Sequence, residues 1–148
     1  MPAFMKQLGE VWRCANLYRA EQFDGVELNG YHQDLYIIEI CKQPGIPQEK
    51  LAGLIYVHKS NVARQLNLLE EKGFVTRQPD PNDKRNLLVY PTEKALSALP
   101  MIRQVHRRWN ELVLDGLSEE EQEAVARYMA LLSENAKRVI AKHGEERE

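Results

Sequence analysis

Apolar residues recur at spacings of three and four along most of the chain, and this spacing predicts amphipathic helices. In the first such segment, residues 4–22, Leu8, Trp12 and Ala15 share one face with further apolar residues. Helices are predicted over residues 4–22, 31–43, 47–54, 59–72 and 92–115, with a last helix beginning after Ser118. Because each apolar stripe has to be covered by other side chains, the pattern predicts a mainly α-helical protein.

The second predicted helix carries signals at both ends. Asn29 is a favourable N-cap residue at its start, and Pro44 and Gly45 end it. The residues of this helix that we expect to face the core are Leu35, Ile38 and Cys41.

The helix over residues 59–72 has two chemically different faces. The apolar face consists of Val62, Leu66 and Leu69, and the opposite, polar face consists of Ser60, Arg64 and Asn67, with Asn61 on its flank. Hydroxyl, guanidinium and amide groups are the types that hydrogen-bond base edges when a helix enters the major groove. Taken alone, the pattern fits an ordinary amphipathic surface helix about equally well, so the neighbouring residues have to decide.

The residues before this helix have the spacing of a helix-turn-helix. Small Ala52 permits close approach of two helices, Val57 fills the turn, and Ser60 opens the second helix. Such turns often hold a glycine or another residue that tolerates positive φ, and Tyr56 occupies that position here. We therefore expect a turn that is longer or more helical than usual.

Two short segments after Gly73, residues 74–78 and 87–90, have the composition of β-strands. The turn-rich residues between them carry Lys84 and Arg85 at the tip. A β-hairpin that directly follows a helix-turn-helix is a wing, and Arg85 is suited to the minor groove, where the phosphate field is strong. A solvated surface hairpin is the less favoured interpretation.

The fold class predicted from these elements is mainly α with a small β-hairpin wing (α+β), in which terminal helices accompany a winged helix-turn-helix head. A single domain over residues 1–148 fits the length, with 43% hydrophobic and 28% charged residues. The net charge of −2 argues by itself against a nucleic-acid partner, but cations concentrate in the centre of the chain and acids near its C-terminus. The distribution of charge matters more than the total.

The two cysteines and four histidines match no metal-ligand spacing, so neither a metal nor another cofactor is predicted. The cysteine usage fits a reduced, cytoplasmic compartment. No apolar run approaches the length that spans a bilayer, so no membrane association is expected. An enzyme is not predicted, because no nucleophile–base spacing, phosphate loop or paired-carboxylate arrangement stands out.

The wing motif resembles that of the MarR family of bacterial winged-helix regulators. The family pattern is Asp, any residue, Arg, and then Leu-Thr after a short strand; here residues 83–85 read Asp-Lys-Arg, and Pro91 replaces the usual leucine before Thr92. Residues 69–75 also match the end of the family's preceding helix, whereas Leu68 stands where a basic or polar residue is common. The resemblance covers nearly the whole chain.

This resemblance implies a winged helix-turn-helix DNA-binding region over residues 30–91, and dimerisation helices over residues 1–24 and 92–143. It also implies that a homodimer binds double-stranded DNA at a pseudo-palindromic operator. The apolar stripes support the dimer independently, because a single small winged-helix core cannot cover the stripes at both ends of the chain. Ser118 and Glu121 form a capping-box pattern at the start of the last helix.

The sequence therefore predicts a dimeric, sequence-specific DNA-binding transcriptional regulator, with repression as the expected role. The residues expected to contact DNA are His58, Lys59, Ser60, Asn61, Arg64, Asn67, Arg77, Asp83, Lys84 and Arg85. Within the wing, Asp83 is expected to hold the Arg85 guanidinium in one orientation. An alternative is a winged-helix module that binds protein, which would show apolar or acidic groups on this face; only Leu68 fits that alternative.

The resemblance also implies a small aromatic or hydrophobic effector that releases the DNA. Candidate residues for the effector pocket are Tyr18, Tyr31, His32 and Tyr36. The segment around Cys14 is similar to the one that holds the sensing cysteine in the organic hydroperoxide branch of the family, so a peroxide-sensing repressor is an alternative. The interpretation of Cys14 that we favour is a small apolar residue on a helix face.

Overall fold

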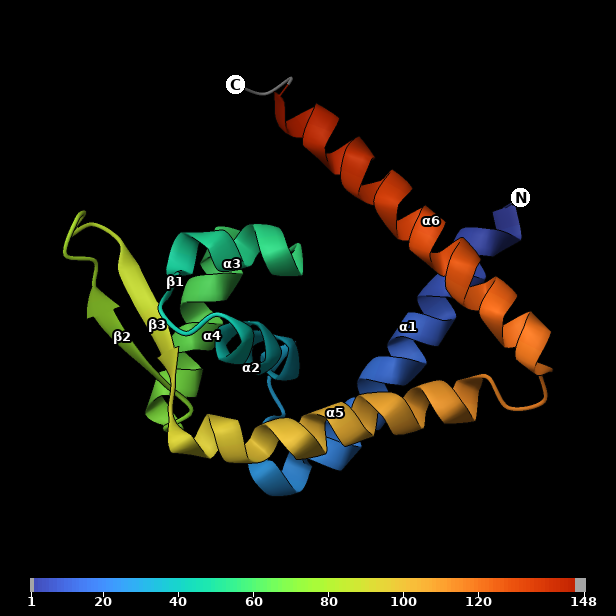
Figure 1. The fold of residues 1–148 in the computed structure, drawn as a ribbon, viewed down its shortest axis with the longest axis horizontal. Coiled ribbons are helices and arrows are strands. Elements are labelled where there is room, and N and C mark those ends of the chain that lie inside the picture. The colour runs from blue at the N-terminus through green and yellow to red at the C-terminus, as the bar shows by residue number, and fades with distance from the viewer. Residues whose placement is uncertain (1, 146–148) are drawn as a thin grey trace. The chain divides into compact units, whose positions relative to one another are not determined.

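The computed structural model describes residues 2–145 as six α-helices and one small sheet (Figure 1). In chain order the elements are α1 (Pro2–Phe23), the 3-10 helix η1 (Asp24–Val26), α2 (Gln33–Lys42), β1 (Ile46–Pro47), α3 (Gln48–Ile55), α4 (Lys59–Glu71), β2 (Val75–Pro79), β3 (Leu87–Pro91), α5 (Glu93–Val113) and α6 (Glu119–Glu145). The predicted fold class is confirmed. Residues 1 and 146–148 of the predicted domain lie outside the described residues. The chain forms two compact units, Met1–Trp109 and Asn110–Glu148.

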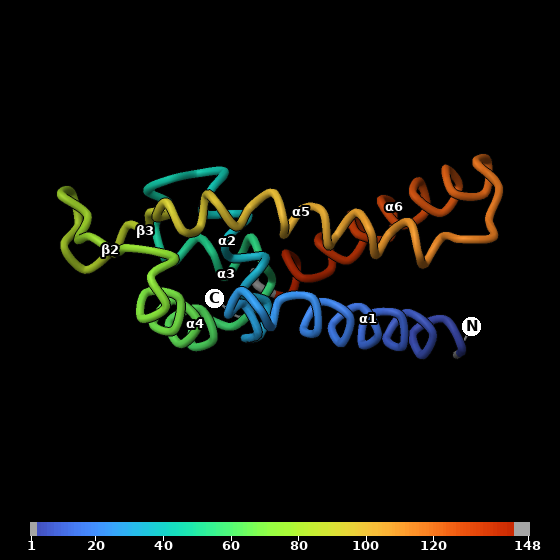
Figure 2. The backbone as a smooth tube through the Cα atoms, turned by 90° about the horizontal axis from the view of Figure 1, so that it is seen from below, coloured from blue at the N-terminus to red at the C-terminus, as the bar shows by residue number. Residues whose placement is uncertain are grey.

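The sheet is antiparallel with the strand order β1-β3-β2. Strands β2 and β3 form the predicted hairpin, with Val75 opposite Pro91 and Pro79 opposite Leu87, and the hairpin projects beyond the helices around it (Figure 2). Strand β1 was not predicted, because two residues are too few to show a period; it forms by pairing Ile46 with Val89. The sheet thereby connects the wing to the start of α3.

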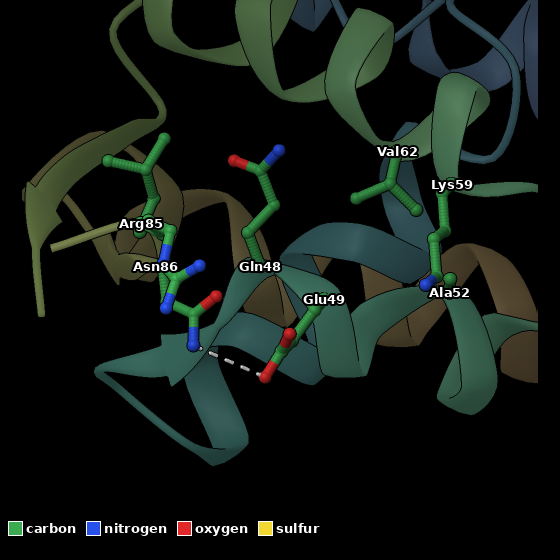
Figure 3. A pocket seen from close by; sticks show the side chains of 8 residues that line it. Gln48, Glu49, Ala52, Lys59, Val62, Arg85 and Asn86 are labelled. Atoms are coloured by element: carbon green, nitrogen blue, oxygen red, sulfur yellow. Dashed lines mark hydrogen bonds between the residues drawn. The ribbon is translucent and has the colours of Figure 1, made fainter. Parts of the chain in front are cut away.

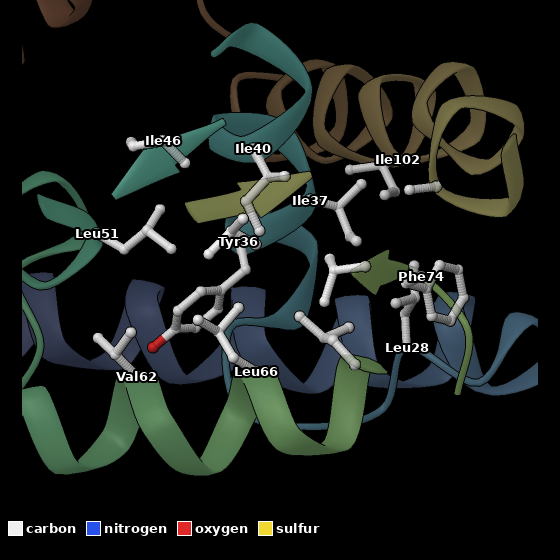
Figure 4. Close-up of a cluster of buried hydrophobic side chains, with 14 of the residues drawn as sticks. Leu28, Tyr36, Ile37, Ile40, Ile46, Leu51, Val62, Leu66, Phe74 and Ile102 are labelled. Atoms are coloured by element: carbon white, nitrogen blue, oxygen red, sulfur yellow. The ribbon is translucent and has the colours of Figure 1, made fainter. Parts of the chain in front are cut away.

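The core of the first unit lies between α2, α4 and the sheet (Figure 4). The prediction for α4 is correct, since Val62, Leu66 and Leu69 are buried. The prediction for α2 has the wrong face: the fully buried apolar residues are Tyr36, Ile37 and Ile40, whereas Leu35, Ile38 and Cys41 are only partly buried. The helix is rotated because its first turn buries two polar side chains, Gln33 and Asp34, which find partners on other elements.

The start of α2 also differs from the prediction. His32, with left-handed backbone angles (φ 57°, ψ 21°), is the N-cap residue in place of Asn29. The Asn29 side chain instead accepts a hydrogen bond of 3.3 Å from Lys72 Nζ at the C-terminal end of α4. Lys72 also donates to the Glu27 carbonyl oxygen at 2.8 Å. A contact with a residue more than forty positions away therefore overrides the local capping preference of Asn29.

The helix-turn-helix consists of α3 and α4 and has a tight turn. Tyr56 takes the left-handed conformation (φ 60°, ψ 50°), and the Val57 amide donates to the Ala52 carbonyl at 3.1 Å. Our expectation of a longer or more helical turn is wrong, because Tyr56 accepts the conformation that a glycine would otherwise supply. Helix α4 thus begins at Lys59, as predicted.

The long helices leave much apolar surface exposed. Helix α1 exposes 46% of both Val11 and Trp12, and in the second unit α6 exposes 57% of Tyr128 and 53% of Val139. The predicted capping box begins α6, with Ser118 and Glu121 each accepting a hydrogen bond from the backbone amide of the other. No described helix has both the length and the apolarity needed to cross a membrane.

Candidate nucleic-acid interface

The polar face of α4 lies opposite its buried face, as the helical wheel requires. Ser60, Arg64 and Asn67 are exposed, and so are His58 and Lys59 at the start of the helix. Asn61 is half-buried because its Oδ1 accepts a 3.0 Å hydrogen bond from the Tyr36 hydroxyl, which rises from the core toward α4 (Figure 4). Burial raises the pKa of Tyr36 to about 12, so this hydroxyl is neutral and remains a donor. The core thus reaches the edge of the polar face.

Arg77 on β2 ties the wing to both helices of the helix-turn-helix. Its guanidinium donates to Glu70 from Nε (3.1 Å) and Nη2 (3.2 Å), to Asn67 from Nη2 (2.7 Å), and to Gln48 at the start of α3 from Nη1 (3.2 Å). The hydrogen bond from Arg77 holds the pKa of Glu70 below its usual range, so Glu70 stays ionised at neutral pH. The Arg77 side chain is only 15% exposed. Arg77, although predicted to contact DNA, is therefore engaged in hydrogen bonds within the protein.

At the tip of the wing, Asp83 and Arg85 are in contact. Asp83 Oδ1 accepts a 3.1 Å hydrogen bond from the Arg85 amide and lies 3.6 Å from Arg85 Nε. The Arg85 side chain is 94% exposed, and Lys84 beside it is exposed as well. An arginine that is both exposed and partly oriented can enter a groove at a reduced entropic cost.

A shallow groove separates the wing from the helix-turn-helix (Figure 3). It has a volume of about 190 Å³, and its lining includes Gln48, Lys59 and Arg85. Across it, Asn86 Nδ2 donates to Glu49 Oε1 at 3.5 Å. The groove joins the start of α4 to the wing tip, so both lie at the edges of one continuous surface.

A second hollow, of about 290 Å³, lies between the end of α1 and the start of α2. Tyr31 and His32 of the proposed effector residues line it, together with Arg19 and Asp34. The other two effector candidates do not line it: Tyr36 lies in the core, and Tyr18 stacks on Trp109 with ring centroids 5.5 Å apart.

The polar wall of this second hollow is a charge cluster. Asp34 accepts a 2.6 Å hydrogen bond from His106 Nε2, and Arg19 Nη1 lies 3.5 Å away from the same oxygen. Burial by itself would raise the pKa of Asp34, but the His106 hydrogen bond and the Arg19 charge together hold it below its usual range. Burial, and then the Arg19 charge, lower the pKa of His32.

Cys14 lies on an exposed face of α1 in the single chain. It does not line either of the two hollows described above.

Sequence reasoning missed two residues that organise the interface. Gln65 is buried within α4 and accepts a 3.0 Å hydrogen bond from Gln33 Nε2 on α2. Gln48 lies at the first position of α3 and accepts from Arg77. A glutamine on the buried side of a predicted helix is a signal that a polar partner is required, but the sequence does not identify the partner.

Comparisons with known proteins agree with this architecture. The family model described as the MarR family matches residues 33–87. The chain is 30% identical over 138 residues to the uncharacterized HTH-type transcriptional regulator YybA of Bacillus subtilis (strain 168), covering 93% of this chain and 91% of that protein.

Solved structures show the same likeness. The crystal structure of the transcriptional regulator SlyA has a TM-score of 0.85 and 33% identity, covering 91% of this chain and 94% of that one. A Listeria monocytogenes structure, described as a MarR family transcriptional regulator complexed with 26mer DNA, has a TM-score of 0.81 and 27% identity, covering 90% and 88%. With the helix-turn-helix, the wing and a relative matched over nearly its whole length, the chain belongs to the MarR family of winged-helix transcriptional regulators.

Proposed function

We propose that this protein is a homodimeric, sequence-specific DNA-binding repressor of the cytoplasm that binds a pseudo-palindromic operator and is released by a small aromatic or hydrophobic effector. The observation that carries DNA binding is that Lys59 at the start of α4 and Arg85 at the wing tip line one groove, while Ser60, Arg64 and Asn67 on the polar face of α4 are exposed. Helix and wing can then contact the major and minor grooves together. That a relative of 27% identity was crystallised with DNA supports this proposal.

Selection from a library of random double-stranded oligonucleotides tests sequence-specific binding. We expect an enriched pseudo-palindrome and a site bound far more tightly than scrambled DNA. Arg64→Ala should weaken that site by about 1–3 kcal/mol and relax the base preference at one position of each half-site. Arg107→Ala on α5 is the matched control, since Arg107 is also exposed but lies on another element. Failure to enrich any sequence would refute the proposed readout.

The apolar surface of the terminal helices supports the proposed dimer. Side chains such as Trp12 on α1 and Val139 on α6 are half exposed within the single chain. Exposed apolar area on this scale is characteristic of an interface. A second copy of the chain, related by a two-fold axis, would supply the matching apolar surface and two DNA-binding heads.

The hydrogen bonds around the second hollow support the proposed effector response. Residues 27–32 connect η1 to α2. Lys72 at the end of α4 bonds to this connection, and the buried Gln33–Gln65 pair joins the start of α2 to α4. A ligand that moves Tyr31 or His32 would therefore disturb the helix that carries the DNA-contacting face. Apolar Phe23 and Leu28 on the wall of the hollow fit an aromatic ring, and Arg19 offers a cation.

A panel of phenolic acids tests the effector response by thermal shift and by release of the selected DNA. We expect a compound that raises the melting temperature and weakens DNA binding, and we expect Tyr31→Ala to lose both effects while keeping DNA affinity. A compound that acts equally on the variant would exclude this hollow as its site.

The exposure of Cys14 favours keeping the peroxide-sensing alternative as a second candidate. In that case Cys14→Ser should abolish release by an organic hydroperoxide without changing DNA affinity. Equal release of both proteins would refute a sensing role. The protein-binding alternative finds less support, because exposed Leu68 is accompanied on α4 by exposed Arg64 and Lys59.

A further inference from the structure

Three carboxamides border the DNA-facing surface, and in each the oxygen is held by a donor from inside the protein. Arg77 donates to Asn67 Oδ1 at 2.7 Å and to Gln48 Oε1 at 3.2 Å, while the Tyr36 hydroxyl donates to Asn61 Oδ1 at 3.0 Å. A carboxamide accepts hydrogen bonds at its oxygen and donates them from its nitrogen. With the oxygen engaged, the nitrogen of each amide is the end available to a ligand.

For Asn67 and Gln48 this orientation follows from the chemistry of the partner. A guanidinium has five N–H donors and no acceptor, so an amide nitrogen cannot bond to it and the oxygen has to face it. The arginine cannot easily turn away, because its Nε and Nη2 also bind the two carboxylate oxygens of Glu70 at 3.1 and 3.2 Å. Arg77 is thus held in one place and in turn orients both amides.

Further groups on the same surface are donors as well. Arg64 and Lys59 on α4, and Arg85 at the wing tip, are exposed and carry only N–H groups. The carboxylate of Glu70, three residues from Asn67 on α4, is engaged by Arg77. The DNA-facing side of α4 is therefore dominated by hydrogen-bond donors.

We propose that this surface reads hydrogen-bond acceptors, with Arg77 as the positioning residue that makes Asn67 a donor. This inference rests on the proposed DNA-binding function. In the major groove guanine presents two acceptors, N7 and O6, whereas an asparagine pairs with adenine in a bidentate way only when its oxygen and nitrogen are both available. Because guanine alone offers two acceptors and no donor on its major-groove edge, we expect Asn67 to donate to guanine or to a phosphate oxygen, and not to form the bidentate pair with adenine.

The isosteric variant Asn67→Asp tests the inference. An aspartate keeps an oxygen against Arg77, so the fold is retained, but it replaces the outward N–H donor by an acceptor. On the selected operator we expect a loss of affinity of about tenfold or more. Gln104→Glu on α5 is the matched control, because it makes the same change of charge on an exposed side chain outside this surface. Affinity and base preference equal to those of the control would overturn the inference.

Repeating the selection with Asn67→Asp distinguishes the two kinds of acceptor. If Asn67 donates to guanine, the guanine preference at one position of each half-site is lost and cytosine, whose amino group is a donor, is gained. If Asn67 donates to phosphate, affinity falls for all sequences and the base preference stays unchanged. A wild-type preference for adenine that disappears in Asn67→Asp would overturn the inference.

Arg77→Lys tests the positioning role, since it keeps the charge but removes the planar set of donors. We expect the Asn67 amide to rotate. If Asn67 contacts a base, adenine then becomes acceptable where guanine was preferred; if it contacts a phosphate, affinity falls for all sequences. Because the variant keeps the positive charge, the dependence of affinity on salt should be unchanged. Unchanged affinity and base preference would contradict the positioning role. If the wild-type protein selects no sequence, the proposed function fails. If the wild-type protein selects a sequence and the Asn67 and Arg77 variants bind it in the same way, only this inference fails.

Discussion

Tyr56 adopts a backbone conformation that costs a side-chain-bearing residue about 1–2 kcal/mol. The φ of 60° is imposed by the turn that joins α3 to α4, since the Val57 amide has to reach the Ala52 carbonyl at 3.1 Å. Tyr56→Gly should relieve this strain, whereas Tyr56→Ala removes the same exposed ring and keeps the strain. We expect the glycine variant to be more stable than the alanine variant by about 1 kcal/mol, less the larger backbone entropy of glycine in the unfolded chain.

Urea unfolding of the two Tyr56 variants checks this prediction through their midpoints at equal m-values. An alanine variant as stable as the glycine variant would mean that the turn is not strained at this residue.

At the wing tip, the charge of Asp83 and its contact with Arg85 are expected to have opposite effects on DNA affinity. Asp83 Oδ1 accepts a 3.1 Å hydrogen bond from the Arg85 amide and lies 3.6 Å from Arg85 Nε, so we expect it to restrict the arginine. Arg85→Ala should weaken all DNA sites nearly equally and reduce the salt slope by about one. Asp83→Ala should weaken binding too, although it removes a negative charge that repels phosphate.

Affinity measured against salt concentration decides between these effects. Glu93→Ala is the control, because it removes an equal exposed charge at the start of α5. Tighter binding by Asp83→Ala would show that the aspartate does not organise the wing.

Between elements, a hydrogen bond from the half-buried His106 to the buried carboxyl of Asp34 connects α5 to α2. His106 donates to Asp34 at 2.6 Å, and with Arg19 it lowers the pKa of Asp34 despite the opposing effect of burial. A carboxyl whose pKa is lowered in the folded state stabilises the fold above its unfolded pKa of about 3.9. That stabilisation is lost as pH falls through the folded pKa, so unfolding should become easier below about pH 4.

Urea titrations at a series of pH values measure this dependence, and Asp34→Asn should flatten it. Asp24→Asn serves as the control at an exposed carboxyl on η1. An acid dependence that is the same in Asp34→Asn and wild type would assign it to other carboxyl groups.

At the scale of the whole molecule, the terminal helices predict self-association. Sedimentation should show a dimer at micromolar concentration. Leu132→Glu places a charge at an apolar position of α6 that is 37% exposed, and we expect it to shift the protein toward monomer because a buried unpaired charge is costly. Ser133→Glu, at the adjacent exposed position, should leave the dimer intact. A wild-type protein that sediments as a monomer with α1 and α6 folded would refute the proposed interface.

The features that could be predicted without the structure are those that depend on neighbouring residues. The apolar period of Val62, Leu66 and Leu69 was sufficient to orient α4, and the turn-rich residues between two β-prone segments were sufficient to predict the wing. The Asp83–Arg85 contact also joins residues two apart, so its prediction required no knowledge of the fold. Helical and strand periods, caps and turns are local, which is why they can be predicted from one sequence.

Which polar side chains are available to a partner depends on contacts between distant segments of the chain. Arg77 was predicted to contact DNA on the strength of its charge, yet Gln48, Asn67 and Glu70 surround its guanidinium. Similarly, the side chain of Asn29, which was expected to cap α2, instead accepts a hydrogen bond from Lys72. Each of these contacts joins residues from separate elements, and a buried or half-buried polar group takes whichever partner the fold brings to it. The hydrogen-bonding character of the DNA-facing surface is therefore a property of the packing of α3, α4 and β2, because none of these segments alone orients its amides.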